Sequence, residues 1–151
     1  TVNGLHTSMP YCFAEHLYPG VPKLRLHTIE KHVPFHIGDI SVLPIEVMHD
    51  KLPILGYRFD NLVYITDMKS ISEEELPYLQ DVDTLVVNAL RFDKPHHSHQ
   101  LVDDAIMFSR RIGARRTYLI HMTHEIGTHT EAEKRLPEQF HFAYDGLKIS
   151  V

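Results

Sequence analysis

The 151-residue sequence has a single cysteine, Cys12, and no tryptophan. One cysteine cannot form a disulfide within the chain, which suits a reducing compartment and excludes a cysteine-based zinc site. A bilayer-spanning helix needs roughly 18 consecutive apolar residues, and no stretch approaches this length. The first residues also lack the basic segment and long apolar segment of a signal peptide. We therefore expect a cytoplasmic protein with no membrane partner.

Positive charge is scarce as well. The formal net charge is -5 at pH 7, so the chain as a whole offers no basic surface for a nucleic-acid backbone. With 43% hydrophobic and 23% charged residues, the chain is suited to form a folded core. We expect one domain over residues 1–151, with further residues upstream because the sequence begins at a threonine. The one compositional excess is histidine, with 13 residues.

The hydrophobic pattern predicts an α/β fold with a mixed sheet and flanking helices. Strand-like segments rich in β-branched and aromatic residues lie at 39–48, 54–59, 61–66, 83–90 and 116–120. Between the last two segments, one helical face is predicted by Leu101, Ala105, Phe108 and Ile112. Gly113 is suited to end that helix. The order strand, helix, strand over residues 83–120 indicates a parallel crossover.

Two local patterns predict further elements. Ser72 followed by Glu75 is typical of a capping box at the start of a helix, which Pro77 keeps short or irregular. The acidic residues of this run are expected to be solvated. Near the end of the sequence, residues 139–151 are expected to form a hairpin, because the pair Asp145-Gly146 is typical of a two-residue turn.

Three of the predicted strands run into residues that bind metals. Residues 39–48 lead into His49, residues 61–66 into Asp67, and residues 116–120 into His121. Taken singly, each has a plain alternative, such as a turn for the aspartate. However, ligands collect outside the carboxyl ends of strands in open α/β sheets, so the three side chains are expected to meet there. Imidazole and carboxylate are ligands for zinc, manganese or iron.

A histidine-rich loop precedes the predicted helix, with His96, His97 and His99 in the segment PHHSH. Free backbone N–H groups and the helix dipole favour an anion there, and an imidazole could hold a phosphate or protonate a leaving group. The alternative is that His99 or Ser98 only caps the helix and the other histidines are solvated. For His96 and His97 we favour this alternative.

Asn88 is a polar residue inside the apolar segment LVVNAL. A buried amide needs hydrogen-bond partners, so this side chain could orient a neighbouring ligand.

The segments quoted above, together with EVMHDKLPILGYRF, ARRTYLIHMTHE and LPEQFHFAYDG, resemble the C-terminal half of metallo-β-lactamase-fold hydrolases of the phosphodiesterase branch. That branch includes cyclic-phosphate phosphodiesterases and, more distantly, the tRNA 3′-processing endonuclease. The resemblance implies that His49 and His121 are metal ligands and that Asp67 bridges two metal ions. It also implies that His99 contacts the scissile phosphate and that His124 supports the ligands.

The resemblance further implies an αββα sandwich and two divalent ions, zinc or manganese, that act on a small phosphorylated substrate. One motif of that family, HxHxDH, is absent, because the nearest match, HSHQLV at 97–102, has Leu101 and Val102 where the motif needs Asp and His. We therefore expect the sequence to be the C-terminal portion of a longer hydrolase, inactive alone. Such a portion exposes a normally covered face, so homo-oligomerisation or swapping is also expected.

Two functions of other kinds remain open from the sequence. The histidines could hold a structural ion, or none, in a non-catalytic metal-binding or interaction domain. Alternatively, they could form a pH-sensing surface that becomes charged below about pH 6.5. Neither alternative explains why the metal-binding residue types stand at the ends of strands.

Overall fold

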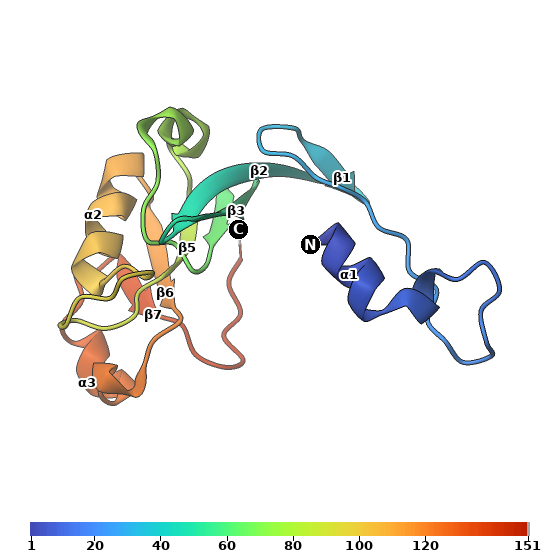
Figure 1. The fold of residues 1–151 in the computed structure, drawn as a ribbon. Coiled ribbons are helices and arrows are strands. Elements are labelled where there is room, and N and C mark those ends of the chain that lie inside the picture. Colours follow the sequence, from blue (N-terminus) through green and yellow to red (C-terminus); the bar gives the residue numbers. More distant parts are fainter. Residues whose placement is uncertain (151) are drawn as a thin grey trace. The chain divides into compact units, whose positions relative to one another are not determined.

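A computed structural model describes residues 1–150, and the chain divides into two compact units (Figure 1). The first unit, Thr1–Glu30, contains helix α1 (Val2–Ser8) and the 3₁₀-helix η1 (Pro10–Phe13). The second unit begins at Lys31 and contains the strands and the candidate site. Among residues 1–150, no helix has the length and apolar character needed to cross a membrane.

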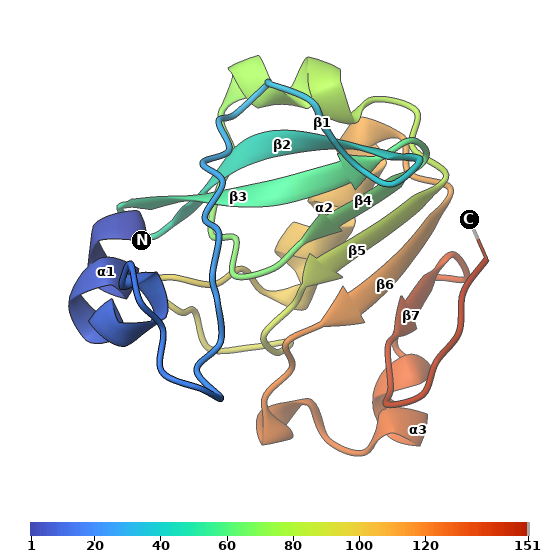
Figure 2. The same cartoon turned by 90° about the vertical axis from the view of Figure 1, so that its right-hand side faces the viewer.

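The strands of the second unit form one mixed sheet whose order follows the sequence from β1 to β7 (Figure 2). Neighbours are antiparallel from β1 to β4 and parallel from β4 to β7. The strand bounds are β1 (Phe35–Ile37), β2 (Ile40–His49), β3 (Leu52–Phe59), β4 (Leu62–Ile65), β5 (Thr84–Asn88), β6 (Arg116–Ile120) and β7 (Phe140–Phe142). This architecture confirms the predicted α/β class with a mixed sheet.

The predicted crossover is also confirmed. Helix α2 (Val102–Ile112) connects β5 to β6, and these two strands pair in parallel. The helix ends at Gly113, which adopts a left-handed φ of 71°, and the next amide, of Ala114, donates to the carbonyl of Ser109 at 3.1 Å. The crossover places the loop before α2 at the carboxyl ends of the parallel strands.

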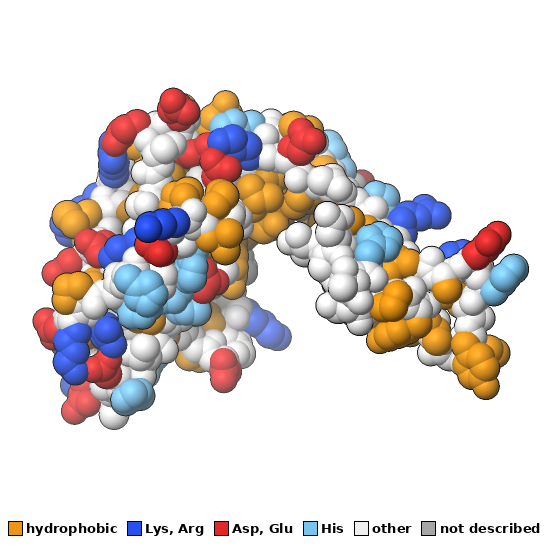
Figure 3. All heavy atoms as spheres, in the orientation of Figure 1, with side chains coloured by type: hydrophobic (Ala, Val, Ile, Leu, Met, Phe, Trp, Pro, Cys, Tyr) orange, Lys and Arg blue, Asp and Glu red, His pale blue; other side chains and the backbone are white. Residues whose placement is uncertain are grey.

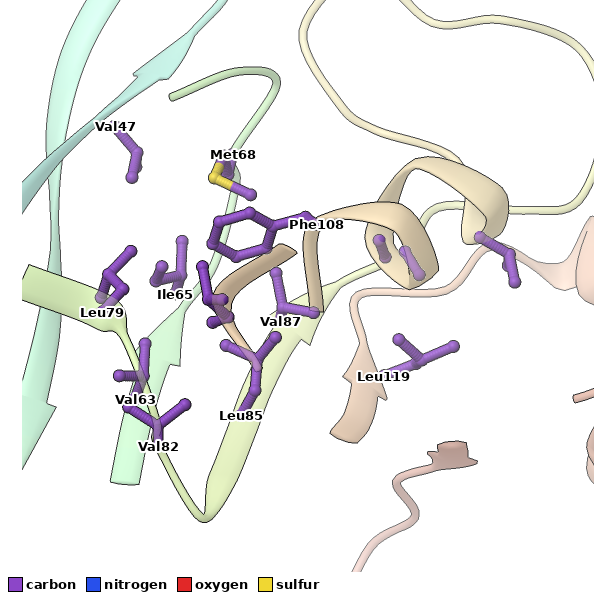
Figure 4. Packing of buried hydrophobic residues seen from close by; sticks show 14 of the residues in the cluster. Val47, Val63, Ile65, Met68, Leu79, Val82, Leu85, Val87, Phe108 and Leu119 are labelled. Atoms are coloured by element: carbon purple, nitrogen blue, oxygen red, sulfur yellow. The ribbon is translucent and has the colours of Figure 1, made fainter. Parts of the chain in front are cut away.

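The core lies between the sheet and α2. Strand residues of β2, β4 and β5 meet Phe108 of α2 there, as Figure 4 shows. Ile65 and Val87 are fully buried, as the predicted apolar strands require. Burial of each large aliphatic or aromatic side chain contributes about 1.5 to 3 kcal/mol. This packing fixes the strands whose ends carry the predicted metal ligands.

The predicted hairpin at the end of the chain is wrong. Only Phe140–Phe142 form a strand, and residues 147–150 do not pair with it. A turn does form, since the Leu147 amide donates to the Tyr144 carbonyl at 3.0 Å. Gly146 has a φ of 88°, but Asp145 is not among the residues with positive φ. The favoured two-residue hairpin turn needs positive φ at both positions, so this turn does not return the chain antiparallel to β7.

The predicted capping box is wrong as well. Ser72 precedes the 3₁₀-helix η2 (Glu73–Leu79), but its side chain makes no capping bond. Glu75 is 2% exposed instead of solvated. Its carboxylate accepts hydrogen bonds from the Glu46 amide at 3.1 Å and from the His32 ring, whose Nε2 lies 2.7 Å away. The partners come from distant segments, so the local pattern could not reveal them.

Candidate metal centre

The predicted metal ligands all lie at one edge of the sheet. His49 is the last residue of β2, Asp67 follows β4 by two residues, and His121 comes directly after β6. Strands β5 and β6 point toward this edge in Figure 2. Strand β2 points the same way as β4, because two antiparallel pairings separate them. The sheet topology therefore brings together residues far apart in the sequence.

The distances between these side chains are short. His49, Asp67 and His99 each offer a ligand atom, and these atoms all lie within 4.8 Å of one another. His121 Nε2 lies 3.5 Å from Asp67 Oδ1. The His99 ring centroid is 4.9 Å from that of His49 and 4.7 Å from that of His121. His99 is thus the central imidazole of the group.

Two of the ligand-type residues have unusual backbone conformations. Asp67 has a φ of 60° and His121 a φ of 63°. Residues other than glycine adopt this left-handed region rarely, at a cost of about 1 to 3 kcal/mol when the conformation is strained. Such a conformation turns the side chain away from the direction that the strand would give it. The surrounding fold must therefore hold both residues in place.

Asn88 provides such support for Asp67. This residue ends β5 and is fully buried. Its Oδ1 accepts a hydrogen bond from the Met68 amide at 2.8 Å, and its Nδ2 donates to the Met68 carbonyl at 2.9 Å. The Asn88 side chain thus holds the peptide groups next to Asp67. That it orients a metal ligand stays a prediction.

His99 is held by its backbone and surrounded by other imidazoles. Its carbonyl accepts a hydrogen bond from Lys69 Nζ at 3.2 Å. Burial lowers the pKa of the His99 ring below its ordinary value of 6.5, and the neighbouring His121 and His49 lower it further, while Asp67 acts in the opposite direction. The ring therefore favours its neutral form, which is the form that can bind a metal ion through a nitrogen lone pair.

The alternative that His99 or Ser98 caps helix α2 is wrong. The residue before α2 is Leu101, and its amide donates to Asp104 Oδ2 at 3.0 Å. The loop is held from the other side by Arg91, which donates to the Lys94 carbonyl at 2.9 Å and pairs with Glu125. The histidine loop is thus anchored at both ends, next to the strand edge.

His96 is placed differently from the expectation of a solvated side chain. Its ring stacks on His99 with centroids 5.0 Å apart and planes 16° apart, and His97 lies 4.4 Å away on a tilted plane. Figure 3 shows histidine side chains gathered on one surface of the second unit. The sequence signal was the PHHSH run itself, although spacing within a loop does not determine which rings meet.

His124 is not among the residues whose side chains meet in this group. It begins the 3₁₀-helix η3 (His124–Ile126) and is exposed. Within residues 1–150, its side chain has no hydrogen bond and no ring contact. Its supporting role stays a prediction. The chain then continues through the short helix α3 (His129–Glu133) to β7.

An open pocket of about 430 Å³ adjoins the group. His49 lines it together with the β2–β3 turn and the histidine loop, through Asp50, Lys51, Leu52, His97 and Ser98. Because His49 belongs to both, the pocket is the natural place for the part of a ligand that extends away from the metal-binding side chains.

The arrangement fits a divalent metal ion. The donor set of imidazoles and one carboxylate is the set that zinc and manganese accept. His99 Nδ1 is buried and, within residues 1–150, has no hydrogen-bond partner. A buried polar atom without a partner costs free energy, so this nitrogen, on a ring that neighbours a carboxylate and two imidazoles, fits a metal-binding site. His49, Asp67, His99 and His121 are the residues able to hold it.

Comparisons with known proteins agree with this architecture. A family model described as a beta-lactamase superfamily domain matches residues 1–122. The chain belongs to the beta-lactamase superfamily. Within that superfamily, its mixed sheet and flanking helices have the metallo-β-lactamase fold, whose members are generally hydrolases that bind divalent metal ions.

Similar proteins are longer than this chain. A protein named octanoyltransferase from Porphyromonas gingivalis is 37% identical over 99% of the chain, but the match covers 30% of that protein. A diphosphatase from the PhnP family, known from a crystal structure, is 28% identical in sequence, with a TM-score of 0.87. The match covers 100% of the present chain and 55% of the diphosphatase chain. The short form of human tRNase Z has a TM-score of 0.60 at 17% sequence identity. The match covers 77% of the present chain and 45% of the tRNase Z chain, and at this identity it shows the fold alone.

Proposed function

We propose that the chain forms part of a metal-dependent phosphodiesterase that acts on a small substrate such as a cyclic phosphate. The main support is the cluster of three imidazoles and one carboxylate at the carboxyl edge of the sheet, with ligand atoms of His49, Asp67 and His99 within 4.8 Å. The 28% identity to a diphosphatase over the whole chain supports phosphoester chemistry.

Each residue of the cluster has a role in this proposal. His49 and His121 would hold metal ions through their ring nitrogens, together with Asp67, whose Oδ1 lies 3.5 Å from His121 Nε2. Bound divalent cations supply Lewis-acid stabilisation of phosphoryl oxygens and lower the pKa of water. His99 contacts the phosphoryl group and donates a proton to the leaving oxygen as the bond between phosphorus and that oxygen breaks. Because the lowered pKa favours the neutral ring, His99 would take up this proton from bulk water before it donates, and the attacking water would release its own proton to bulk water.

The similarity to the protein named octanoyltransferase does not indicate that this chain transfers octanoyl groups. The match covers 30% of the octanoyltransferase, so most of that protein lies outside it. The one cysteine of the chain, Cys12, is 1% exposed and belongs to the first unit, whereas the histidine cluster belongs to the second. The cluster itself offers metal-binding groups, which acyl transfer through a covalent intermediate does not require.

We propose that the complete protein supplies further metal ligands. Two ions need more donors than the three proposed ligands His49, Asp67 and His121 provide, and the sequence contains no HxHxDH motif. The chain spans about half the length of the matched diphosphatase and under a third of the matched octanoyltransferase. The portion carrying the missing ligands would complete both the site and the sandwich.

Metal content and hydrolysis together test the proposal. We would measure bound zinc and manganese by elemental mass spectrometry, and hydrolysis of bis(p-nitrophenyl) phosphate, in the 151-residue chain and in the protein extended upstream. We expect metal and turnover in the extended protein, and loss of turnover by at least about 1,000-fold in Asp67→Ala, as removal of a central catalytic group typically gives. Asp103→Ala, which removes an exposed carboxylate from the first turn of α2, is the matched control.

The outcomes separate the proposal from its alternative. Turnover that survives in Asp67→Ala would show that the assignment of the bridging ligand is wrong. Metal binding without turnover of any phosphodiester in the extended protein would instead support a non-catalytic metal-binding domain.

We further propose that the chain on its own self-associates through the sheet face opposite α2. Tyr57, Tyr64, Val86 and Tyr118 stand in register across four strands on that face. Tyr64 is 43% exposed, the other two tyrosines are partly exposed, and Val86 is buried between them. A partly exposed row of aromatic side chains favours association. A monomeric mass in multi-angle light scattering at concentrations up to about 100 µM, far above typical dissociation constants of specific complexes, would contradict this.

A further inference from the structure

His96 has no assigned role in the site, although its ring is fixed from two sides. One face stacks on His99, with the ring centroids 5.0 Å apart and an angle of 16° between the planes. On the edge of the ring, the Ser98 amide donates a hydrogen bond to His96 Nδ1 at 3.3 Å. Ser98 is only 4% exposed, so the group that holds Nδ1 is itself part of the packed loop.

The hydrogen bond from Ser98 determines the tautomer of His96. A backbone N–H can only donate, so Nδ1 must accept and the proton of the neutral ring lies on Nε2. The Ser98 hydroxyl lies 3.2 Å from the same Nδ1 and adds a second donor. Among residues 1–150, no group forms a hydrogen bond with His96 Nε2. The Nε2–H group is therefore a hydrogen-bond donor with a fixed position and without an acceptor among residues 1–150.

The surroundings of this donor suit an anion. Lys69 and Arg91 are the cationic side chains whose charges act on His96. Arg91 and Lys94 both pair with Glu125, whereas Lys69 donates to the His99 carbonyl and forms no ion pair with any residue in the range 1–150. The Lys69 charge thus lies beside the two stacked imidazoles, near the Asp67 carboxylate proposed to face the metal ions, and would stabilise a negatively charged ligand.

We propose that His96 is a further substrate-binding residue, whose Nε2–H donates a hydrogen bond to a non-reacting anionic oxygen of the phosphoryl group beside His99. The proposal rests on the proposed phosphodiesterase function and extends the phosphate-binding group from one imidazole to a stacked pair. Because the tautomer is fixed by Ser98, the donor needs no rearrangement when the substrate binds, which is an advantage for recognition.

Two substitutions at this position distinguish substrate binding from a structural role. The amide nitrogen of a glutamine reaches about as far as Nε2, so His96→Gln keeps a donor to the substrate but loses the acceptor for Ser98. The amide oxygen of an asparagine reaches about as far as Nδ1, so His96→Asn keeps the bond from Ser98 but loses the donor. His36→Asn is the control, because His36 is exposed in β1.

The experiment measures KM and kcat for bis(p-nitrophenyl) phosphate in the metal-loaded, upstream-extended protein, and the dissociation constant of inorganic phosphate by calorimetry. We expect His96→Asn to raise KM and the phosphate dissociation constant by about 10-fold to 100-fold, the effect of losing a hydrogen bond to a charged group. We expect His96→Gln to change both by less than about threefold, and kcat and metal content to stay constant in both variants.

The reverse order, in which asparagine is tolerated and glutamine is not, would overturn the proposal and show that His96 only holds the loop. Unchanged phosphate binding in both variants would overturn it too. Failure of the proposed function is a separate result, namely no hydrolysis by the unsubstituted protein. In that case, phosphate binding that weakens in His96→Asn but not in His96→Gln would still support His96 as an anion-binding residue.

Discussion

Replacing Asn88 by alanine tests whether the buried amide positions the metal site. Asn88 is fully buried, and its side chain makes two hydrogen bonds with the backbone of Met68, directly after Asp67. The Met68 carbonyl keeps a second donor in Asn88→Ala, the Gln100 amide at 3.2 Å. Among residues 1–150, the Met68 amide has no other acceptor, so the substitution leaves a buried N–H without a partner.

The size of the effect follows from these contacts. Two hydrogen bonds contribute about 0.5 to 1.5 kcal/mol each, and an unsatisfied buried N–H costs about 1 to 3 kcal/mol, with partial overlap between the two effects. We therefore expect Asn88→Ala to lower the free energy of unfolding by about 2 to 4 kcal/mol. Release of the peptide groups beside Asp67 should also weaken metal binding by about 10-fold to 100-fold, as for other residues that orient a ligand.

Urea unfolding and metal competition with a chromophoric chelator measure the two effects separately. The control is Ser109→Ala, which removes the buried 2.6 Å hydrogen bond between Ser109 and Thr117, between α2 and β6. This variant should be destabilised with unchanged metal affinity. If Asn88→Ala were destabilised to a similar extent and bound metal as tightly as the unsubstituted protein, the role of Asn88 in positioning Asp67 would be refuted.

Three further predictions concern the fold and its stability. Gly56→Ala should lower the free energy of unfolding by about 1 to 3 kcal/mol, because the new Cβ would lie 2.6 Å from Ile65 Cγ1; an unchanged urea midpoint would contradict this. A hydrogen bond from Arg116 lowers the pKa of Asp83 below its ordinary value of 3.8. The ionised Asp83 therefore stabilises the folded protein fully above pH 3.8, and this stabilisation is lost as the pH falls through the lowered pKa. Asp83→Asn should therefore lose less stability on acidification below pH 4 than the unsubstituted protein in thermal melts, and equal slopes would contradict the ion pair. Removal of bound metal by a chelator should lower the melting temperature, since a ligand at about 100 times its dissociation constant stabilises by about 2.7 kcal/mol.

The sequence by itself determined the elements whose signals are local. The apolar stripe of residues 101–112 and Gly113 predicted α2 and its end, and the apolar segment around Val87 predicted a strand. The ends of strands also depend on local sequence, which is why His49, Asp67 and His121 could be selected as ligand candidates from their positions alone. Hydrophobic burial makes such patterns informative, because each element must turn its apolar side to the core whatever its partner is.

Only the tertiary structure decided which side chains meet. Three contacts illustrate this: Asn88 holds the backbone of Met68, Glu75 is buried against His32, and His96 stacks on His99. The first two join segments far apart in the sequence, and the third depends on the path of a loop. Hydrogen bonds and ring contacts act over a few ångströms, so they depend on the final packing and leave no periodic trace in the sequence. For the same reason, the turn at Gly146 formed without the expected hairpin, because pairing needs a partner strand in register as well as a turn.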